Sequence, residues 1–179
     1  MKTEIPTPVE MTPNSSGTIQ SLDDATEMTP LIIDLKNILV PLDFSETSLK
    51  SLQYAVPFAK QFGAKLTLLH VVEPNAYTPE LPSPGPLNPE HHNEVLRKLE
   101  EIRAAKIPAE LDVDTAVRHE FVFDGILEVA REIQADLIIT TTHGYTGLKH
   151  VLMGSTAENI VRKAPCPVLV VREIEHDFV

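Results

Sequence analysis

The sequence has a single cysteine, fewer basic than acidic residues, and no long apolar run. Because Cys166 has no second thiol to pair with, an intramolecular disulfide is excluded, which fits a reducing compartment. No segment approaches the ~18 apolar residues of a membrane-spanning helix. Residues 1–30 also lack the apolar centre of a signal peptide. We therefore expect a cytoplasmic protein without a membrane partner.

Acidic side chains outnumber basic ones in the chain as a whole. The sequence has 15 Lys and Arg residues against 26 Asp and Glu residues, so its formal net charge is −11 at pH 7. Nucleic acids and anionic membranes repel a chain of this charge, which disfavours both as partners. If the ligand is a polyanion, local N–H donors have to hold it against the overall field.

Several motifs of nucleotide and metal chemistry are absent. No GxGxxG follows an expected strand and no GxxxxGK(S/T) occurs, which excludes the dinucleotide fingerprint and the usual P-loop. No Ser, Cys or Lys nucleophile stands beside a base in a known catalytic motif. The histidines show no metal-ligand spacing, since His91 and His92 are adjacent and such neighbours on a helix do not face one another. We assign no catalytic residue and no metal ligand.

One globular pattern lies between segments of different composition. Residues 1–35 are rich in Pro, Ser, Thr and Glu and hold no aromatic residue. This predicts a flexible or loosely docked extension, and the alternative is an arm that binds a partner. Residues 36–173 form the expected domain, with an irregular segment at 74–90 that carries six prolines. Residues 174–179 are a C-terminal tail.

Within the domain, short apolar runs alternate with segments of helical spacing. Strands are expected over residues 38–42, 65–72, 114–120, 136–141 and 167–171. Helices are expected from a Ser45 cap to a Gly63 stop, around Asn93, after an Asp124 cap, and over about 156–163. Such alternation predicts an α/β fold, an open doubly wound parallel sheet with helices on both faces. Ligands of such sheets bind beyond the carboxyl ends of the strands.

The most informative stretch follows the fourth expected strand. Thr141-Thr142-His143-Gly144 is followed by nine residues and then by Gly154-Ser155-Thr156 at the start of a helix. Small residues between a strand and a helix let backbone N–H groups approach an anion, which indicates a nucleotide or phosphate site. Two structural explanations stay open. Ser155 and Glu158 can form a capping box, and Asp43 can favour the start of the first helix.

Five passages together resemble the universal stress protein family over about residues 36–172. They are Ile38-Leu39-Val40-Pro41-Leu42-Asp43-Phe44-Ser45, Leu68-Leu69-His70-Val71-Val72, Ala135-Asp136-Leu137-Ile138-Ile139, the two segments 142–148 and 152–158, and Ala164-Pro165-Cys166-Pro167-Val168-Leu169-Val170-Val171. The resemblance implies a five-stranded Rossmann-like sheet of the adenine-nucleotide alpha-hydrolase kind, in the order 3-2-1-4-5. It also implies a regulator of stress adaptation with at most slow ATP hydrolysis.

The resemblance further implies an ATP site, with Mg²⁺ or Mn²⁺ accompanying the phosphates. The family's ATP-binding members carry Gly-x2-Gly-x9-Gly followed by Ser or Thr. This sequence reads Thr141-x2-Gly144-x9-Gly154-Ser155. The resemblance implies that Asp43 and Val71 lie on the adenine side and that Pro41 lines the pocket. It implies that the ribose and phosphates are held by Gly144, Gly154, Ser155 and Thr156.

Thr141 is where the chain departs from that signature. Its Cβ stands where the family has a glycine suited to close backbone approach. The alternative hypothesis is therefore an interaction module of the same fold that binds no nucleotide. A nucleotide hydrolase or transferase is a third hypothesis, and it would need a positioned base or a catalytic loop, neither of which is evident.

The final strand and its cysteine bear on partners. The resemblance implies a homodimer paired through residues 167–171 at the sheet edge, and an apolar edge strand favours the same contact because it needs a cover. Cys166, between two prolines, is expected to serve packing rather than redox chemistry.

Overall fold

The computed structural model describes residues 33–73, 89–142 and 154–172. The elements alternate along the chain as β1 (Asn37–Pro41), α1 (Glu46–Phe62), β2 (Lys65–Val72), α2 (Pro89–Lys106), β3 (Val113–His119), α3 (Val122–Glu132), β4 (Leu137–Thr141), α4 (Ser155–Lys163) and β5 (Val168–Val171). The expectations for residues 1–32, most of the proline-rich segment, the loop with Gly144, and the C-terminal tail fall outside the described residues.

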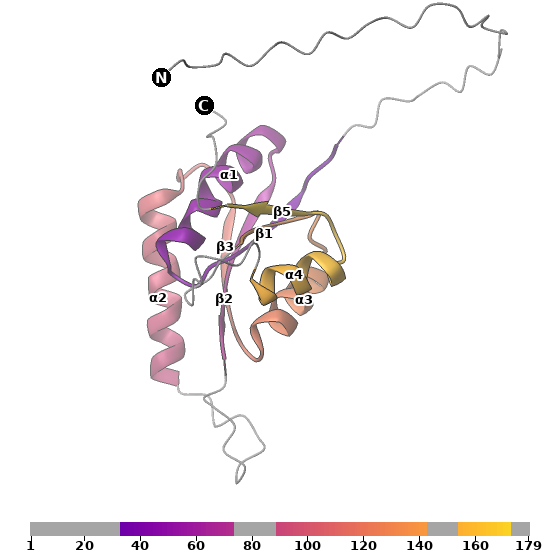
Figure 1. Ribbon diagram of the computed structural model, residues 1–179. Helices are drawn as coiled ribbons and strands as arrows, with labels where there is room; N and C mark the ends of the chain where they lie inside the picture. Colours follow the sequence, from indigo (N-terminus) through magenta and orange to yellow (C-terminus); the bar gives the residue numbers. More distant parts are fainter. Residues whose placement is uncertain (1–32, 74–88, 143–153, 173–179) are drawn as a thin grey trace, which may run out of the picture. The chain divides into compact units, whose positions relative to one another are not determined.

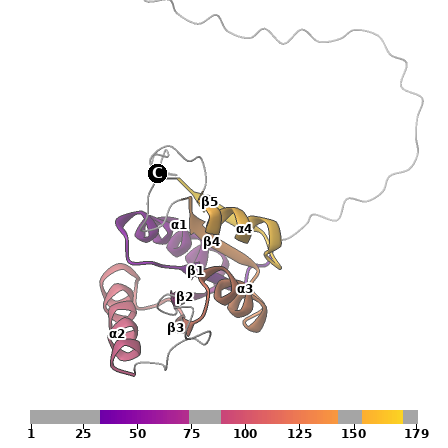
Figure 2. The ribbon, with the colours of Figure 1, turned by 60° about the horizontal axis from the view of Figure 1, so that its bottom comes forward.

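The five strands form one parallel sheet in the order β3-β2-β1-β4-β5 (Figures 1 and 2). This confirms the strand order and the doubly wound α/β fold. Strand β1 lies at the centre and pairs with both β2 and β4. The chain winds one way from β1 to β3 and then the other way through β4 and β5. The switch in winding direction therefore falls at the carboxyl ends of β1 and β4.

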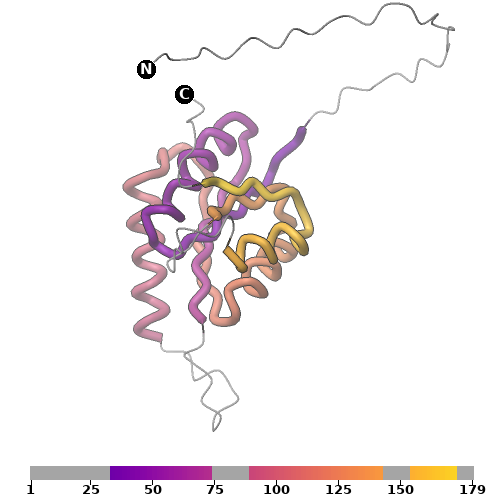
Figure 3. Tube along the Cα trace, viewed as in Figure 1, coloured from indigo at the N-terminus to yellow at the C-terminus, as the bar shows by residue number. Residues whose placement is uncertain are grey.

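Both faces of the sheet are covered, and neighbouring residues of β1 point to opposite faces. Ile38 and Val40 join a core cluster with α1 and α2, whereas Leu39 joins a second cluster with α3 and α4. Figures 1 and 3 show these two helix pairs on opposite sides of the sheet. Strands buried on both faces are expected to read as continuous apolar runs, which is how the sequence reads here.

The first helix begins and ends where the sequence predicts. The Ser45 hydroxyl accepts a hydrogen bond from the N–H of Ser48 at 3.0 Å, which caps α1. Gly63 follows the last turn with φ +65°, the left-handed conformation that glycine adopts at low cost. These contacts confirm both limits of α1.

Two other predicted caps are wrong. Asp124 lies in the first turn of α3, where its charge favours the helix dipole, and Phe121 stands at the cap without a side-chain hydrogen bond. Gly154 stands at the cap of α4, so Ser155 is the first helical residue and forms no capping box. Glu158 pairs instead with Arg162, at 2.9 Å. The helices start earlier than the polar residues suggested.

The second helix begins inside the segment that was expected to be irregular. Pro89 is the first residue of α2, so the helix overlaps the expected range 74–90 at Pro89 and Glu90. Proline suits the first helical position because the N–H that it lacks has no partner within the helix.

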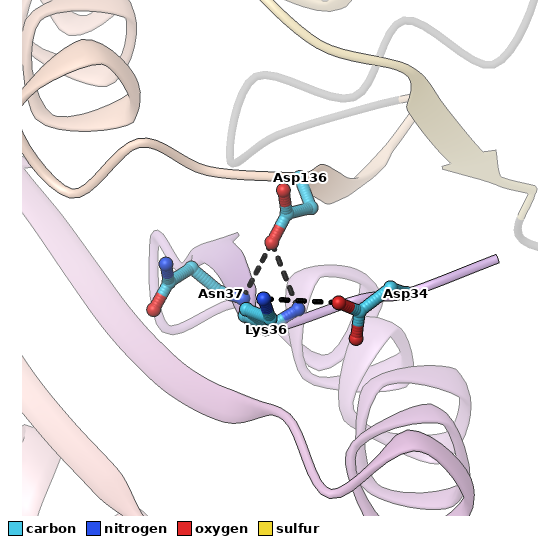
Figure 4. A network of polar contacts seen from close by, with 4 residues as sticks. All are labelled: Asp34, Lys36, Asn37 and Asp136. Atoms are coloured by element: carbon cyan, nitrogen blue, oxygen red, sulfur yellow. Dashed lines mark hydrogen bonds and ion pairs between the residues drawn. The ribbon is translucent and has the colours of Figure 1, made fainter.

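A carboxylate ties the start of β1 to the start of β4 (Figure 4). Asp136 Oδ2 accepts hydrogen bonds from the N–H of Lys36 at 2.8 Å and of Asn37 at 2.9 Å. The N–H of Asp136 donates in return to the carbonyl oxygen of Asn37 at 2.8 Å. Lys36 also pairs with Asp34 at 3.0 Å, an exposed contact that adds little. The network fixes β1 against β4 at the N-terminal ends of the two strands. The predicted site lies at their carboxyl ends.

Candidate functional site

A cleft of about 310 Å³ opens at the carboxyl ends of β1, β2 and β4. Its walls include seven of the eight residues that the sequence singled out, which are Pro41, Asp43, Val71, Thr141, Gly154, Ser155 and Thr156. The eighth, Gly144, lies outside the described residues. The cleft also holds polar residues that the sequence analysis did not assign to the site, which are Ser48, His70, Glu73, Thr140 and Thr142.

One side of the cleft is the start of α4. The N–H of Gly154 donates to the carbonyl oxygen of Thr142 at 2.8 Å, and the N–H of Thr142 donates to the carbonyl oxygen of Val171 at 3.0 Å. A Cβ on Gly154 would lie 3.1 Å from that Thr142 oxygen, a contact so tight that the neighbouring backbone would have to shift by a few tenths of an ångström. Ser155 and Thr156 follow as the first two helical residues. The N–H groups of a first helical turn have no partner within the helix and suit an anion.

The opposite side is the turn from β1 into α1, which presents Asp43. Asp43 Oδ1 accepts hydrogen bonds from the N–H of Ser45 at 3.0 Å and from its hydroxyl at 2.5 Å. Ser45 in turn caps α1. The carboxylate is therefore held in place by the same residue that starts the helix. Supporting the helix start and lining the cleft are compatible, and Asp43 does both.

Behind Asp43, the turn rests on the imidazole of His70 in β2. The Nδ1–H of His70 donates to the carbonyl oxygen of Leu42 at 2.7 Å, because a carbonyl can only accept. Its ring stacks on Phe44, with ring centroids 4.3 Å apart. Burial lowers the pKa of His70, against the opposing effects of the Leu42 carbonyl and Asp43. The ring is therefore neutral at pH 7.

The floor of the cleft is the end of β4. Thr140, Thr141 and Thr142 are all buried, and Thr141 is only 8% exposed. Thr141 pairs in register with Val171 of β5. Three successive buried threonines give the floor hydroxyl groups in an otherwise apolar strand. Thr141 also brings a Cβ to the place where the family signature has glycine.

The third wall is α3, which packs closely on β2. A Cβ on Gly125 would lie 3.1 Å from Val71 Cγ1 and 3.1 Å from Glu120 Cγ, so glycine permits this approach. Val122 and Ile126 of α3 line the cleft beside Val71. This side is consequently apolar, whereas the α4 side is polar.

Two histidines meet outside the cleft, a contact the sequence did not reveal. His92 Nδ1 lies 2.9 Å from His119 Nε2, joining the start of α2 to the end of β3. Burial and the nearby His92 and His91 lower the pKa of His119. Within residues 33–73, 89–142 and 154–172, no three His, Cys, Asp or Glu side chains are placed to hold a metal ion. No helix in this part of the chain has the length and apolar character to cross a membrane.

Fold and cleft together define a Rossmann-like α/β protein with a polar cleft where the sheet changes winding direction. The model of the Universal stress protein family matches residues 34–172, and the chain belongs to this family. It is 34% identical to universal stress protein MJ0531 of Methanocaldococcus jannaschii over 143 residues, which cover 77% of this chain and 82% of that protein.

Solved structures show the same fold. The hypothetical protein MJ0577 matches with a TM-score of 0.69 and 30% identity, covering 80% of this chain and all of that one. A universal stress protein solved in complex with cAMP matches with a TM-score of 0.57 and 23% identity, covering 78% of this chain and 98% of that one. At 23% identity the likeness concerns the fold alone.

Proposed function

We propose that the cleft binds an adenine nucleotide, ATP with Mg²⁺ or Mn²⁺, and that nucleotide occupancy regulates a cytoplasmic, homodimeric protein of stress adaptation. The observation that carries this proposal is the convergence of Asp43, Val71 and the start of α4 on one cleft. These groups come from three separate stretches of the sequence. Each belongs to the set of residues that the resemblance to the family relates to ATP.

The two sides of the cleft suit the two ends of a nucleotide. Val71 and Pro41 offer apolar contact to a base, and the Asp43 carboxylate, which only accepts hydrogen bonds, suits an amino group or a ribose hydroxyl. On the other side, Ser155 and Thr156 stand at the positive end of a helix, where backbone N–H groups and hydroxyls favour phosphate. Because Ser155 lies inside the helix rather than at its cap, capping does not explain its presence.

Electrostatics favours a metal ion that travels with the phosphates. Asp43 and Glu73 both line the cleft, and the chain carries a formal charge of −11. A triphosphate entering beside two carboxylates is repelled, and a divalent cation coordinated by phosphate oxygens reduces that repulsion. We therefore propose that the cation binds together with the nucleotide, as part of the ligand, and not at a metal site of the protein alone.

A regulatory role agrees better with the cleft than an enzymatic one. Among the described residues that line the cleft, no lysine or arginine stands ready to stabilise charge on a transferred phosphoryl group. We therefore propose at most slow hydrolysis.

The second candidate is an interaction module of the same fold that binds no nucleotide. It is favoured by Thr141, whose buried side chain lines the cleft at the position of the signature's first glycine. Under this hypothesis the fold serves protein contacts only. The two candidates differ in whether the cleft takes ATP at all.

The test is calorimetric titration of the full chain, purified without added nucleotide, with ATP in the presence of Mg²⁺. Acid extraction of the same sample, followed by chromatography, detects any adenine nucleotide that co-purifies. Saturable binding heat or bound nucleotide is the expected result. A flat titration together with a nucleotide-free extract would favour the interaction module. Product formation beyond one turnover, lost in Gly154→Ala, would be needed to establish hydrolysis.

A further inference from the structure

His70 contacts both chain neighbours of Asp43. Its Nδ1–H donates to the carbonyl oxygen of Leu42 at 2.7 Å, and its ring stacks on Phe44 with an interplanar angle of 17°. Leu42 and Phe44 are the residues immediately before and after Asp43. One imidazole therefore contacts the backbone or side chain on either side of the carboxylate that lines the cleft.

The contact with Leu42 extends the pairing of β1 with β2 past the last strand residue. The N–H of Leu42 donates to the carbonyl oxygen of Leu69 at 2.8 Å, and the Leu42 carbonyl accepts from His70. Leu42 is buried, and the loss of a hydrogen-bond partner by a buried carbonyl destabilises the folded protein. Both polar groups of the Leu42 backbone are thus bonded to neighbouring residues of β2.

The contact with Phe44 holds an unfavourable backbone conformation. Phe44 has φ +67°, the left-handed region that bulky residues rarely adopt. Such a conformation persists only where surrounding contacts hold it. The Phe44 ring stacks on His70 and lies 5.9 Å from Lys98 Nζ of α2, and it packs against the first core cluster. This reversal of the backbone directs the chain from β1 into α1.

We propose that His70 is a positioning residue of the nucleotide cleft, which fixes the Asp43 carboxylate by holding Leu42 and Phe44 on either side of it. The inference rests on the proposed function, because the ligand that Asp43 meets there is the nucleotide. His70 acts through Asp43 and does not need to touch the ligand itself.

The positioning depends on a hydrogen bond and a stacked ring, not on charge. The described ionisable groups that face His70 are Asp43 from the turn, and His91 and Lys98 from α2. Burial lowers the pKa of His70, so the ring that donates to Leu42 is uncharged at neutral pH. Uncharged replacements therefore separate the two contacts. Asn places a donor near the position of Nδ1, and Phe keeps a ring without a donor.

The first arm of the test needs no ligand. Backbone amide NMR signals of residues 42–45 are compared in the full-length wild type, His70→Asn, His70→Phe and the control His119→Asn. We expect both His70 variants to shift the Asp43 and Ser45 amides while the control leaves them in place. In the wild type, the same amides should follow the titration of the His70 ring, with a midpoint below 6.5. Unmoved Asp43 and Ser45 amides in both His70 variants would overturn the proposal.

The second arm asks whether His70 acts on the ligand through Asp43. ATP with Mg²⁺ is titrated into wild type, Asp43→Asn, His70→Phe and the double variant. Each single variant should bind about three- to tenfold more weakly, the range for one lost hydrogen bond. If His70 acts through Asp43, the double variant should lose no more than Asp43→Asn alone.

Losses that simply multiply in the double variant would overturn the positioning role even if ATP binds well. Conversely, a wild type that binds no ATP would contradict the proposed function. The ligand-free amide arm would then decide the positioning role by itself, so the two failures are distinguishable.

Discussion

The backbone N–H of Gly154 donates to the carbonyl oxygen of Thr142 at 2.8 Å, which joins the start of α4 to the end of β4. A Cβ at position 154 would lie 3.1 Å from the same oxygen. The φ of Gly154 is −68°, which any residue adopts, so space rather than backbone conformation disfavours a larger residue here. Because the interior is closely packed, a side chain at position 154 would push α4 and β4 slightly apart.

Gly154→Ala should therefore lower both stability and ligand affinity. We expect a loss of about 1–2 kcal/mol in the free energy of unfolding, typical of overpacking by one carbon. ATP affinity should fall as well, because Ser155 and Thr156 move with the helix start. Urea unfolding and calorimetric titration measure the two effects. Glu158→Gln, which removes an exposed charge from the same helix, is the control that should retain binding. Unchanged affinity in Gly154→Ala would contradict this account of the α4 side.

Thr141→Gly tests whether the departure from the family signature limits binding. Thr141 is buried and lines the cleft, so removal of its Cβ should raise ATP affinity, by up to about tenfold if one overly close contact is relieved. Thr141→Ala keeps the Cβ and should gain less. Titration of the three proteins at equal Mg²⁺ makes the comparison. Equal affinities would mean that the site tolerates threonine without crowding.

Asp136→Ala should destabilise the fold without touching the cleft. The variant leaves the N–H groups of Lys36 and Asn37 without their shared acceptor, which should cost about 1–3 kcal/mol of unfolding free energy. Asp34→Ala removes only the exposed partner of Lys36 and is the control, for which no measurable change is expected. Urea unfolding compares the variants. Equal stability of Asp136→Ala and wild type would show that the network contributes nothing.

Stability should decrease on mild acidification. The pKa values of His70 and His119 are lowered in the folded protein, chiefly by burial, so the unfolded chain binds more protons in this range. The contribution of both residues is complete above pH 6.5 and is lost as the pH falls through their lowered values. Urea midpoints from pH 8 to pH 5 should therefore fall. His70→Asn and His119→Asn should each make the urea midpoint depend less steeply on pH. If both variants keep the wild-type dependence on pH, these two histidines do not cause the loss of stability.

The outer edge of β5 offers a test of the proposed homodimer. The carbonyl oxygens of Pro167 and Val171 accept hydrogen bonds from β4, so by strand alternation the N–H of Val170 points to the free edge. Val170→Pro removes that donor without breaking the pairing with β4. Analytical ultracentrifugation should show a dimer for the wild type and for Val170→Thr, and a monomer for Val170→Pro. A Val170→Pro dimer would exclude pairing through this edge.

Much of the fold was predictable because its signals are local. The strands are apolar runs of the right length, and β2 matches its predicted range, Lys65–Val72. Ser45 and Gly63 mark the limits of α1 through chemistry that acts within three or four residues. The other two caps failed because a cap depends on which residue starts the first turn. Asp124 and Ser155 are each displaced from the cap position, although their residue types suit it.

The cleft was predictable to the extent that its residues stand at element ends. Asp43 follows β1, Thr141 is the last residue of β4, and Gly154 precedes α4. Parallel strands bring such positions to one edge of the sheet. His70 could not be found in this way because it lies inside an apolar run and reads as an ordinary strand residue. Its contact with Leu42 depends on the register of β1 with β2. Phe44 gave no signal either, since its residue type does not favour a left-handed turn.

The most direct test of the central claim is an amide NMR map of the full chain with and without ATP and Mg²⁺. We predict that ATP shifts the amides of Asp43, Val71, Ser155 and Thr156 together and saturably. The amides of Thr115 and Arg118, on the far edge of the sheet, should stay in place. A spectrum that ATP leaves unchanged, or saturable shifts confined to residues away from the cleft, would contradict this claim.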